Sequence, residues 1–171
     1  MSIILIGYRG SGKTTVGRLL AQNLSRPFMD ADEKITGMAG QTIKEIFEKH
    51  GEEKFRSLES EVVGRLAKLD GHVLSLGGGA LLREENRRAI AAGKHTVIYL
   101  KADPVELHRR IHSDAATAAN RPNLTPLAGG IEEIRSVLAA REPIYRQMMT
   151  LEIDVTSSSP DQVVEMIRKL I

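Results

Sequence analysis

A lysine and two threonines stand where a glycine-rich loop meets the start of an expected helix. The loop reads GYRGSGKT from Gly7 to Thr14 and follows four apolar residues, 3–6, which predict a short buried strand. Glycines let other groups approach the backbone closely, and the N-terminus of a helix attracts anions. Lys13 adds a positive charge, and Thr14 adds a hydroxyl that suits magnesium. The spacing G-x-x-x-x-G-K-[ST] therefore predicts a loop that binds the phosphates of a nucleoside triphosphate.

Two carboxylates follow in the segment DAD. Asp30 and Asp32 come at the end of a short strand predicted at 28–30. In an extended segment, side chains two residues apart face the same way. Both carboxylates are then expected at the carboxyl edge of a sheet, where ligands collect and where a metal or a hydroxyl needs them. The alternative is that one of the two caps a helix that begins at Glu33.

Three consecutive glycines, 77–79, follow a strand expected at 72–76. Such a run costs conformational entropy, and it is useful where a ligand lies against the backbone. The N–H groups of these glycines can donate to hydroxyls or to a phosphoryl group during its transfer. A plain strand-to-helix turn is the alternative, but such a turn seldom needs three glycines. We therefore expect this segment at the ligand site.

Arginine is the side chain best suited to a carboxylate or a phosphate, because its planar guanidinium is a two-pronged donor. Arg56 lies in an expected helix, Arg121 lies in a long polar segment beside Pro122, and Arg141 lies near an expected helix kink at Pro143. Each of these arginines alone is more typical of a protein surface. Sequence reasoning does not bring them together.

His108 and His112 stand four residues apart on an expected helix, a spacing that suits metal ligands. Zinc proteases with this spacing place a glutamate directly after the first histidine, whereas this chain has Arg109 there. We therefore interpret the two histidines as part of a solvated helix face.

Strands alternate with helices along the rest of the chain. Besides 3–6 and 28–30, strands are expected at 72–76, 95–100 and 151–155. Helix starts are predicted where a capping residue is followed three positions later by Glu or Gln, at Thr42, Asp103 and Ser159. This alternation favours a single α/β domain with a parallel sheet and helices on both faces.

Composition and charge exclude several classes of protein. The chain has 171 residues, which suits one domain, and its 24 basic and 22 acidic residues nearly cancel. We find no basic run suited to nucleic acid and no apolar stretch long enough for a signal peptide or a membrane span. The absence of cysteine excludes disulfides and thiol redox control. We therefore expect a cytoplasmic monomer that binds small molecules, with no nucleic-acid or membrane partner.

In combination, these segments resemble the shikimate kinase family over nearly the whole chain. The resemblance rests on six segments in the family's order: GYRGSGKTTVGR, DADEKI, IKEIFEKHGEEKFRSLE, VLSLGGGA, NRPNLTPLAGG and REPIY. It implies ATP-dependent phosphorylation of the 3-hydroxyl of shikimate, giving shikimate 3-phosphate in aromatic amino-acid biosynthesis. It also implies a three-layer P-loop NTPase fold, with a five-stranded parallel sheet flanked by helices.

The resemblance gives each matched residue an expected role. The residues expected to bind ATP are Gly10, Ser11, Gly12, Lys13, Thr14, Thr15 and Arg121. Those expected to bind shikimate are Asp32, Arg56, Gly78, Gly79 and Arg141. Lys13, Asp32 and Arg121 are the expected catalytic residues, with Asp32 orienting the accepting hydroxyl. Mg²⁺ is expected on Thr14 and, through a water molecule, on Asp30.

The resemblance also divides the single kinase domain, 1–171, into functional parts. It implies a substrate-binding helical region at about 31–62 and a lid at about 112–130, whose first half is longer than in the commonest members. The segment TSSSP, 156–160, lacks the arginine that many members place against adenine.

Three alternatives remain from the residues themselves. Another small-molecule kinase, such as a gluconate kinase, would share the phosphate loop, but GGG and REPIY favour shikimate. A nucleotide monophosphate kinase would also share that loop, but the chain has no segment like DG-x-P-R. A non-catalytic nucleotide-binding protein of the same fold is disfavoured by the intact Lys13, Thr14, Asp30 and Asp32.

Overall fold

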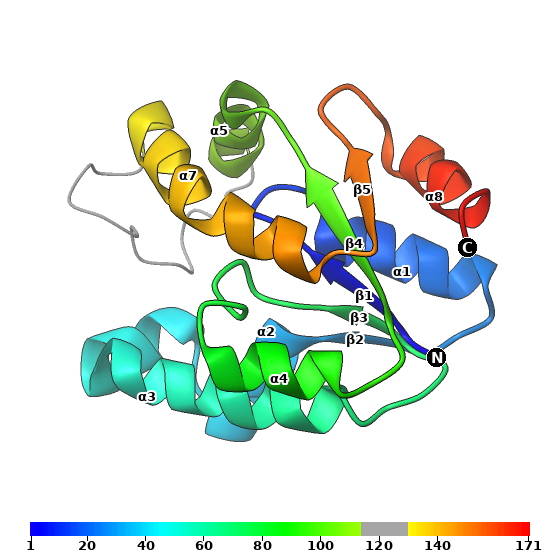
Figure 1. The fold of residues 1–171 in the computed structure, drawn as a ribbon. Coiled ribbons are helices and arrows are strands. Elements are labelled where there is room, and N and C mark those ends of the chain that lie inside the picture. The colour runs from blue at the N-terminus through cyan, green and yellow to red at the C-terminus, as the bar shows by residue number, and fades with distance from the viewer. Residues whose placement is uncertain (114–129) are drawn as a thin grey trace.

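A five-stranded parallel sheet forms the centre of the molecule, with the strands in the order β2-β3-β1-β4-β5 (Figure 1). The computed structural model describes residues 1–113 and 130–171. The strands are β1 (Ile3–Ile6), β2 (Phe28–Asp30), β3 (Val73–Ser75), β4 (Thr96–Lys101) and β5 (Leu151–Asp154). All four residues of the central strand β1 are buried, as expected for an apolar strand covered on both faces. The predicted parallel sheet is therefore confirmed.

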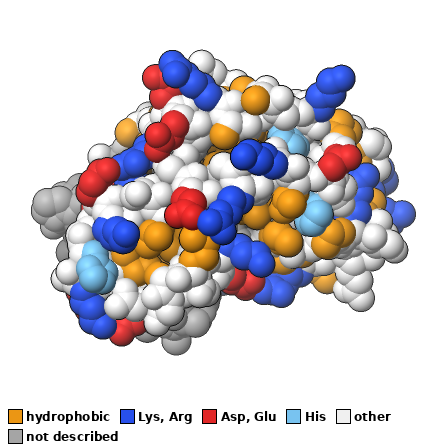
Figure 2. All heavy atoms as spheres, turned by 90° about the horizontal axis from the view of Figure 1, so that it is seen from below, with side chains coloured by type: hydrophobic (Ala, Val, Ile, Leu, Met, Phe, Trp, Pro, Cys, Tyr) orange, Lys and Arg blue, Asp and Glu red, His pale blue; other side chains and the backbone are white. Residues whose placement is uncertain are grey.

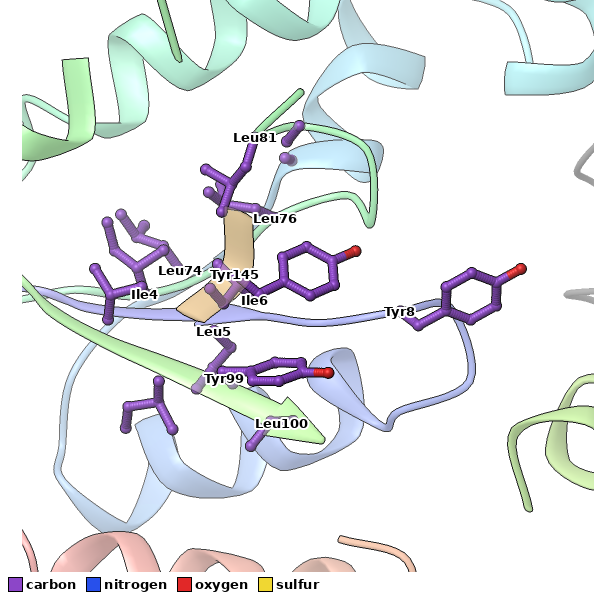
Figure 3. Packing of buried hydrophobic residues seen from close by; sticks show 14 of the residues in the cluster. Ile4, Leu5, Ile6, Tyr8, Leu74, Leu76, Leu81, Tyr99, Leu100 and Tyr145 are labelled. Atoms are coloured by element: carbon purple, nitrogen blue, oxygen red, sulfur yellow. The ribbon is translucent and has the colours of Figure 1, made fainter. Parts of the chain in front are cut away.

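Helices connect the strands and cover both faces of the sheet. They are α1 (Lys13–Asn23), α2 (Ala31–Ala39), α3 (Ile43–Leu66), α4 (Glu84–Ala91), α5 (Pro104–Ser113), α7 (Ile131–Met148) and α8 (Pro160–Arg168). On one face, α1 approaches so closely that a Cβ atom on Gly17 would lie 3.2 Å from Leu5 Cδ1. On the other face, the ring of Tyr145 from α7 packs on Tyr99 of β4, with centroids 5.1 Å apart (Figure 3). The three layers therefore meet in one aliphatic and tyrosine core.

The expected strands all form, with ends within about one residue of the predicted ones. Capping explains why the helix starts were predictable. Thr42 and Ser159 each accept a hydrogen bond from the N–H three residues on, and each receives the reciprocal bond of a capping box. Asp103 accepts a bond of 2.8 Å from the N–H of Val105 at the start of α5.

Two long helices carry a residue that favours a break. Gly51 interrupts α3 with φ 80° and ψ 171°, so α3 consists of two helical segments joined at this glycine. Only glycine takes such a conformation without steric cost. Pro143 lies inside α7, but the helix runs on from Ile131 to Met148, so the expected kink does not end it.

The expected lid, about 112–130, lies almost wholly outside the described residues.

The face that carries α3 and α4 is mixed in charge. In the view from below, lysine and arginine side chains stand among acidic and apolar ones (Figure 2). Within residues 1–113 and 130–171, none of the helices combines the length and the hydropathy that a membrane span requires.

Candidate active site

The phosphate loop leaves the central strand at the carboxyl edge of the sheet. Gly7 has φ 143°, and a Cβ atom there would lie 2.6 Å from the carbonyl oxygen of Leu100 on the neighbouring strand. Any side chain would therefore push the loop away from β4. The loop leads directly into α1, which begins at Lys13, so its N–H groups and the N-terminus of the helix converge on one place.

Lys13 is buried within the loop that it belongs to. Its ammonium group donates to the carbonyl oxygens of Gly7 and Tyr8, at 2.9 and 2.8 Å. The side chain is 8 % exposed. The cation is thus held at the mouth of the loop by groups that phosphate oxygens can replace.

Thr14 and Asp30 form the next element of the site. The Thr14 hydroxyl donates to Asp30 Oδ2 at 2.8 Å, and Asp30 Oδ1 accepts from the N–H groups of Asp32 and Glu33. Asp30 is therefore the N-cap of α2, and Asp32 already lies in the first turn of that helix. The expectation that both residues belong to one extended segment is wrong, because the cap turns the chain after Asp30. Both carboxylates nevertheless reach the same cavity.

We call the cavity above the phosphate loop the loop pocket. Its lining includes the predicted residues Gly10, Gly12, Lys13, Thr14, Thr15, Asp30, Asp32 and Gly78. Ser11 lies on a neighbouring cavity, described below.

A second cavity, the arginine pocket, lies beside the loop pocket. It is lined by Arg9, Asp32, Ile43, Phe47, Phe55, Arg56, Glu59, Gly77, Gly78, Gly79 and Arg141. Arg56 comes from the segment of α3 after Gly51, and Arg141 comes from α7, so the fold brings together two arginines that are far apart in the sequence. Each is 9 % exposed. Buried guanidinium groups that face a common cavity suit a carboxylate ligand.

Glu59 is a site residue that sequence reasoning missed. Its carboxylate accepts from Arg56 Nη1 at 2.7 Å, and the residue is 1 % exposed. Burial raises the pKa of the Glu59 carboxyl, and the charges of Arg56 and Arg141 oppose that rise. Its position three residues after Arg56, on one helix face, is the signal that could have revealed it. Glu59 fixes the Arg56 fork toward the pocket.

The glycine run fits closely against these arginines. A Cβ atom on Gly79 would lie 2.6 Å from Arg56 Nη1, and one on Gly78 would lie 3.5 Å from Arg141 Nη1. The carbonyl oxygen of Gly78 accepts a hydrogen bond from the hydroxyl of Tyr145 on α7. All three glycines of the run 77–79, which the sequence predicts at the ligand site, line the arginine pocket.

The third cavity, the serine pocket, lies at the other end of the loop pocket. Ser11, Thr15, Arg110 and 156–160 are among its lining residues. Arg110 donates to the carbonyl oxygen of Val155 at 2.7 Å and to Glu106 at 2.6 Å. Hydrogen bonds from Arg109 and Arg110 lower the pKa of Glu106 to about 2. Arg110 was not singled out in the sequence, because its contact with the TSSSP segment depends on the strand order.

The loop and arginine pockets share Arg9, Asp32, Gly77 and Gly78. Arg121, expected on the nucleotide, lies outside the described residues. A cavity lined by the phosphate-loop motif thus opens onto a cavity lined by a pair of buried arginines, and the carboxylate of Asp32 belongs to both linings. This fold and this arrangement define a P-loop phosphotransferase for a small molecule.

Comparison with known proteins narrows this class. The family model described as shikimate kinase matches residues 9–171. The shikimate kinase of Symbiobacterium thermophilum is 42 % identical over 99 % of this chain and 96 % of its own length. That of Rhodopirellula baltica is 40 % identical over 98 % and 88 %. The chain therefore belongs to the shikimate kinase family.

Solved structures agree with this family. A shikimate kinase from Acinetobacter baumannii in complex with shikimate matches 99 % of this chain and 91 % of its own, with a TM-score of 0.90 and 34 % identity. A gluconokinase from Sinorhizobium meliloti covers 96 % of the chain with a TM-score of 0.58 and 20 % identity. The second likeness shows a common fold alone.

Proposed function

We propose that the loop pocket and the arginine pocket are the two halves of one site for the reaction of this family. In that reaction, the γ-phosphoryl group of ATP passes to the 3-hydroxyl of shikimate. The observation that carries the proposal is that Asp32 lines both pockets, beside the phosphate loop and beside the arginine pair. A carboxylate at this junction lies where an acceptor hydroxyl must meet the phosphoryl group.

The nucleotide half is the loop pocket together with the serine pocket. The loop N–H groups bind the phosphates, and Lys13 exchanges its two carbonyl partners for phosphate oxygens. The serine pocket then receives the adenine, where Arg110 provides a flat guanidinium surface held by Glu106 and Val155. This arrangement offers an adenine contact on α5 in place of the arginine that TSSSP lacks.

The residues present fit a magnesium ion. Mg²⁺ binds hard oxygen ligands and commonly keeps several waters, using one or two protein groups and the substrate phosphates. Thr14 Oγ1 and Asp30 Oδ2 are oxygens that lie 2.8 Å apart on the floor of the loop pocket. We propose that Thr14 ligates the ion directly and that Asp30 holds one of its waters. The ion would neutralise negative charge on the β- and γ-phosphates.

The acceptor half is the arginine pocket. We propose that Arg56 and Arg141 bind the carboxylate of shikimate, and that Gly78 and Gly79 offer N–H groups to it or to its hydroxyls. The apolar side chains of Ile43 and Phe47, which also line this pocket, match the carbon face of the ring. We assign 31–62, which comprises α2 and most of α3, as the substrate-binding region, because six of the eleven residues that line the arginine pocket come from it.

Asp32 would orient the attacking hydroxyl and accept its proton. Phosphoryl transfer passes through a loose transition state, so positioning and charge neutralisation supply most of the catalysis. Lys13 would neutralise charge on the phosphates, and Arg121 is proposed as a further cation. The base therefore needs a correct position more than a raised pKa.

The test is a coupled assay with ATP–Mg²⁺ and a panel of acceptors that includes shikimate and gluconate. We expect turnover with shikimate and none with gluconate. In the Asp32→Asn variant, kcat should fall about 100-fold or more while the dissociation constant of ADP stays within about twofold, because Asp32 faces the acceptor. Gluconate as the preferred acceptor would overturn the substrate, and equal losses of kcat and ADP affinity would overturn the role of Asp32.

A further inference from the structure

A buried ion pair joins the phosphate loop to α7, and the steps above do not use it. Arg9 Nη2 lies 3.6 Å from Glu133 Oε1. Glu133 is 0 % exposed and Arg9 is 9 % exposed. Taking two charges out of water is costly, so a pair of this kind needs compensation from its geometry or from a function.

Glu133 belongs to a stripe of α7 that carries site residues. Glu133, Val137, Arg141 and Tyr145 are spaced four apart, which places them on one helix face, and all four are buried. Glu133 contacts the phosphate loop through its ion pair with Arg9. Arg141 lies against Gly78, and the hydroxyl of Tyr145 donates to the carbonyl oxygen of Gly78. One rigid helix face therefore rests on the phosphate loop at one end and on the glycine run at the other.

The two loops also abut each other. A Cβ atom placed on Gly78 would lie 3.3 Å from the carbonyl oxygen of Gly7 and 3.5 Å from the backbone nitrogen of Arg9. Arg9 itself lines both the loop pocket and the arginine pocket. Arg9 thus stands at the junction of the two subsites, and its backbone is part of the phosphate loop.

We propose that Arg9 is a positioning residue that, through its ion pair with Glu133, fixes α7 on the phosphate loop. Arg141 is fixed with α7, so the binding of nucleotide and the binding of shikimate strengthen each other. This inference rests on the proposed function of the two pockets. When phosphates order the loop, the backbone of Arg9 is ordered with it. Separating the pair in a medium of low polarity is unfavourable, so Glu133 and the rigid helix follow Arg9. Arg141 is then held in place before shikimate arrives, which lowers the cost of ordering it.

The measurement is the dissociation constant of shikimate by calorimetry, without nucleotide and with saturating ADP–Mg²⁺. For the unmodified protein, we expect ADP to tighten shikimate about tenfold, within the usual range of such couplings. In Glu133→Gln, the tightening by ADP should fall below about twofold, while the dissociation constant of shikimate without nucleotide changes little. The matched control is Glu132→Gln on the same turn, whose exposed carboxylate pairs with Arg135 at 2.7 Å, and which should keep the full factor.

Two further variants separate positioning from general damage. Arg9→Lys keeps the charge opposite Glu133 and should retain most of the coupling. The double variant Arg9→Met with Glu133→Gln removes both charges of this pair together, so neither is left facing a missing partner, and it should still lack the coupling. The proposal is overturned if Glu133→Gln and the double variant both keep the full tightening of shikimate binding by ADP. It is also overturned if these variants weaken shikimate binding equally with and without ADP, or if ADP does not tighten shikimate binding in the unmodified protein. Failure of the unmodified protein to bind shikimate at all would instead overturn the proposed function.

Discussion

Gly79 has no room for a methyl group. Its Cβ would lie 2.6 Å from Arg56 Nη1, and this guanidinium is already held by Glu59 at 2.7 Å. We expect Gly79→Ala to displace the fork and to raise the KM for shikimate at least about tenfold, because small misplacements of a binding group are costly. The KM for ATP and the melting temperature should stay nearly unchanged. Steady-state kinetics with each substrate varied, together with a thermal melt, measures these quantities.

Gly64→Ala is the control for that substitution. Gly64 lies on α3, in the same helical segment as Arg56, and a Cβ atom there meets nothing within 4 Å. This variant should show unchanged kinetics. An unchanged shikimate KM in Gly79→Ala would mean that Arg56 has space to move, and that its observed position is not needed for binding.

Arg141→Lys tests the second half of the arginine pair. A planar guanidinium can form two parallel bonds to a carboxylate, whereas an ammonium group cannot. We expect a shikimate KM raised about tenfold, with a smaller effect on the KM for ATP. Arg135→Lys, an exposed change on the same helix, should leave both constants as they are. If the shikimate KM is the same in both variants, Arg141 does not bind the carboxylate.

The residues of the phosphate loop could be identified from the sequence because their chemistry is local. Lys13 and Thr14 belong to a motif of eight consecutive residues, 7–14, whose predicted role is phosphate binding. Glu59 and Glu133 could not be identified in the same way, since a glutamate on a helix is usually solvated. What makes these two significant is burial against an arginine, and burial depends on how distant helices pack.

At the scale of elements, local signals placed the boundaries well and failed at one junction. Capping boxes set the starts of α3 and α8, and short apolar runs set the strands. The segment DAD was misread because Asp30 ends a strand and caps a helix at once, so Asp32 is already helical. An N-cap and the end of a strand have the same extended backbone, and the sequence alone does not show where the extended run stops.

Glu106 gives α5 a pH-dependent attachment. Its two arginine partners lower the pKa of its carboxyl from 4.5 to about 2. A carboxyl with a lowered pKa in the folded state contributes stability that is complete above about pH 4.5 and is lost as the pH falls toward about 2. We expect the free energy of unfolding of Glu106→Gln to lie below that of the unmodified protein at neutral pH, and the difference to vanish at low pH.

Urea unfolding at a series of pH values measures this difference. Glu48→Gln is the control, because the carboxylate of Glu48 is exposed and lies 3.9 Å from Lys44. A difference for Glu106→Gln that is constant between neutral pH and pH 2 would show that its ion pairs do not stabilise the fold.

At the scale of the whole molecule, the parallel sheet could be predicted from the alternation of strands and helices, but its strand order could not. The order β2-β3-β1-β4-β5 is set by the side on which each crossover helix packs. That order places β1 and β3 side by side, which puts the phosphate loop next to the glycine run. The resemblance to the family supplied what periodicity could not, namely the expectation that Arg56 and Arg141 belong to one site, and both line the arginine pocket.

We expect the protein to be a monomer in solution. Among the described residues, the large exposed apolar side chains come from separate parts of the chain, except for the neighbours Leu170 and Ile171; the others are Met1, Met38, Leu82 and Val105. Stable self-association generally needs a contiguous apolar patch. Sedimentation at several concentrations should give the mass of one 18.8 kDa chain throughout. A mass that rises with concentration would contradict this expectation.

The break at Gly51 separates two groups of residues that line the arginine pocket. The segment of α3 before this glycine carries Ile43 and Phe47, which form the apolar wall of the arginine pocket. The segment after it carries Arg56 and Glu59, which hold the charged end. The two segments also touch each other, because the rings of Phe47 and Phe55 have centroids 4.9 Å apart and the Arg56 guanidinium carbon lies 5.2 Å from the centroid of the Phe55 ring. An engineered first segment that accepts another carboxylated ring would therefore have to keep an aromatic side chain at position 47, so that the support beneath Arg56 is preserved.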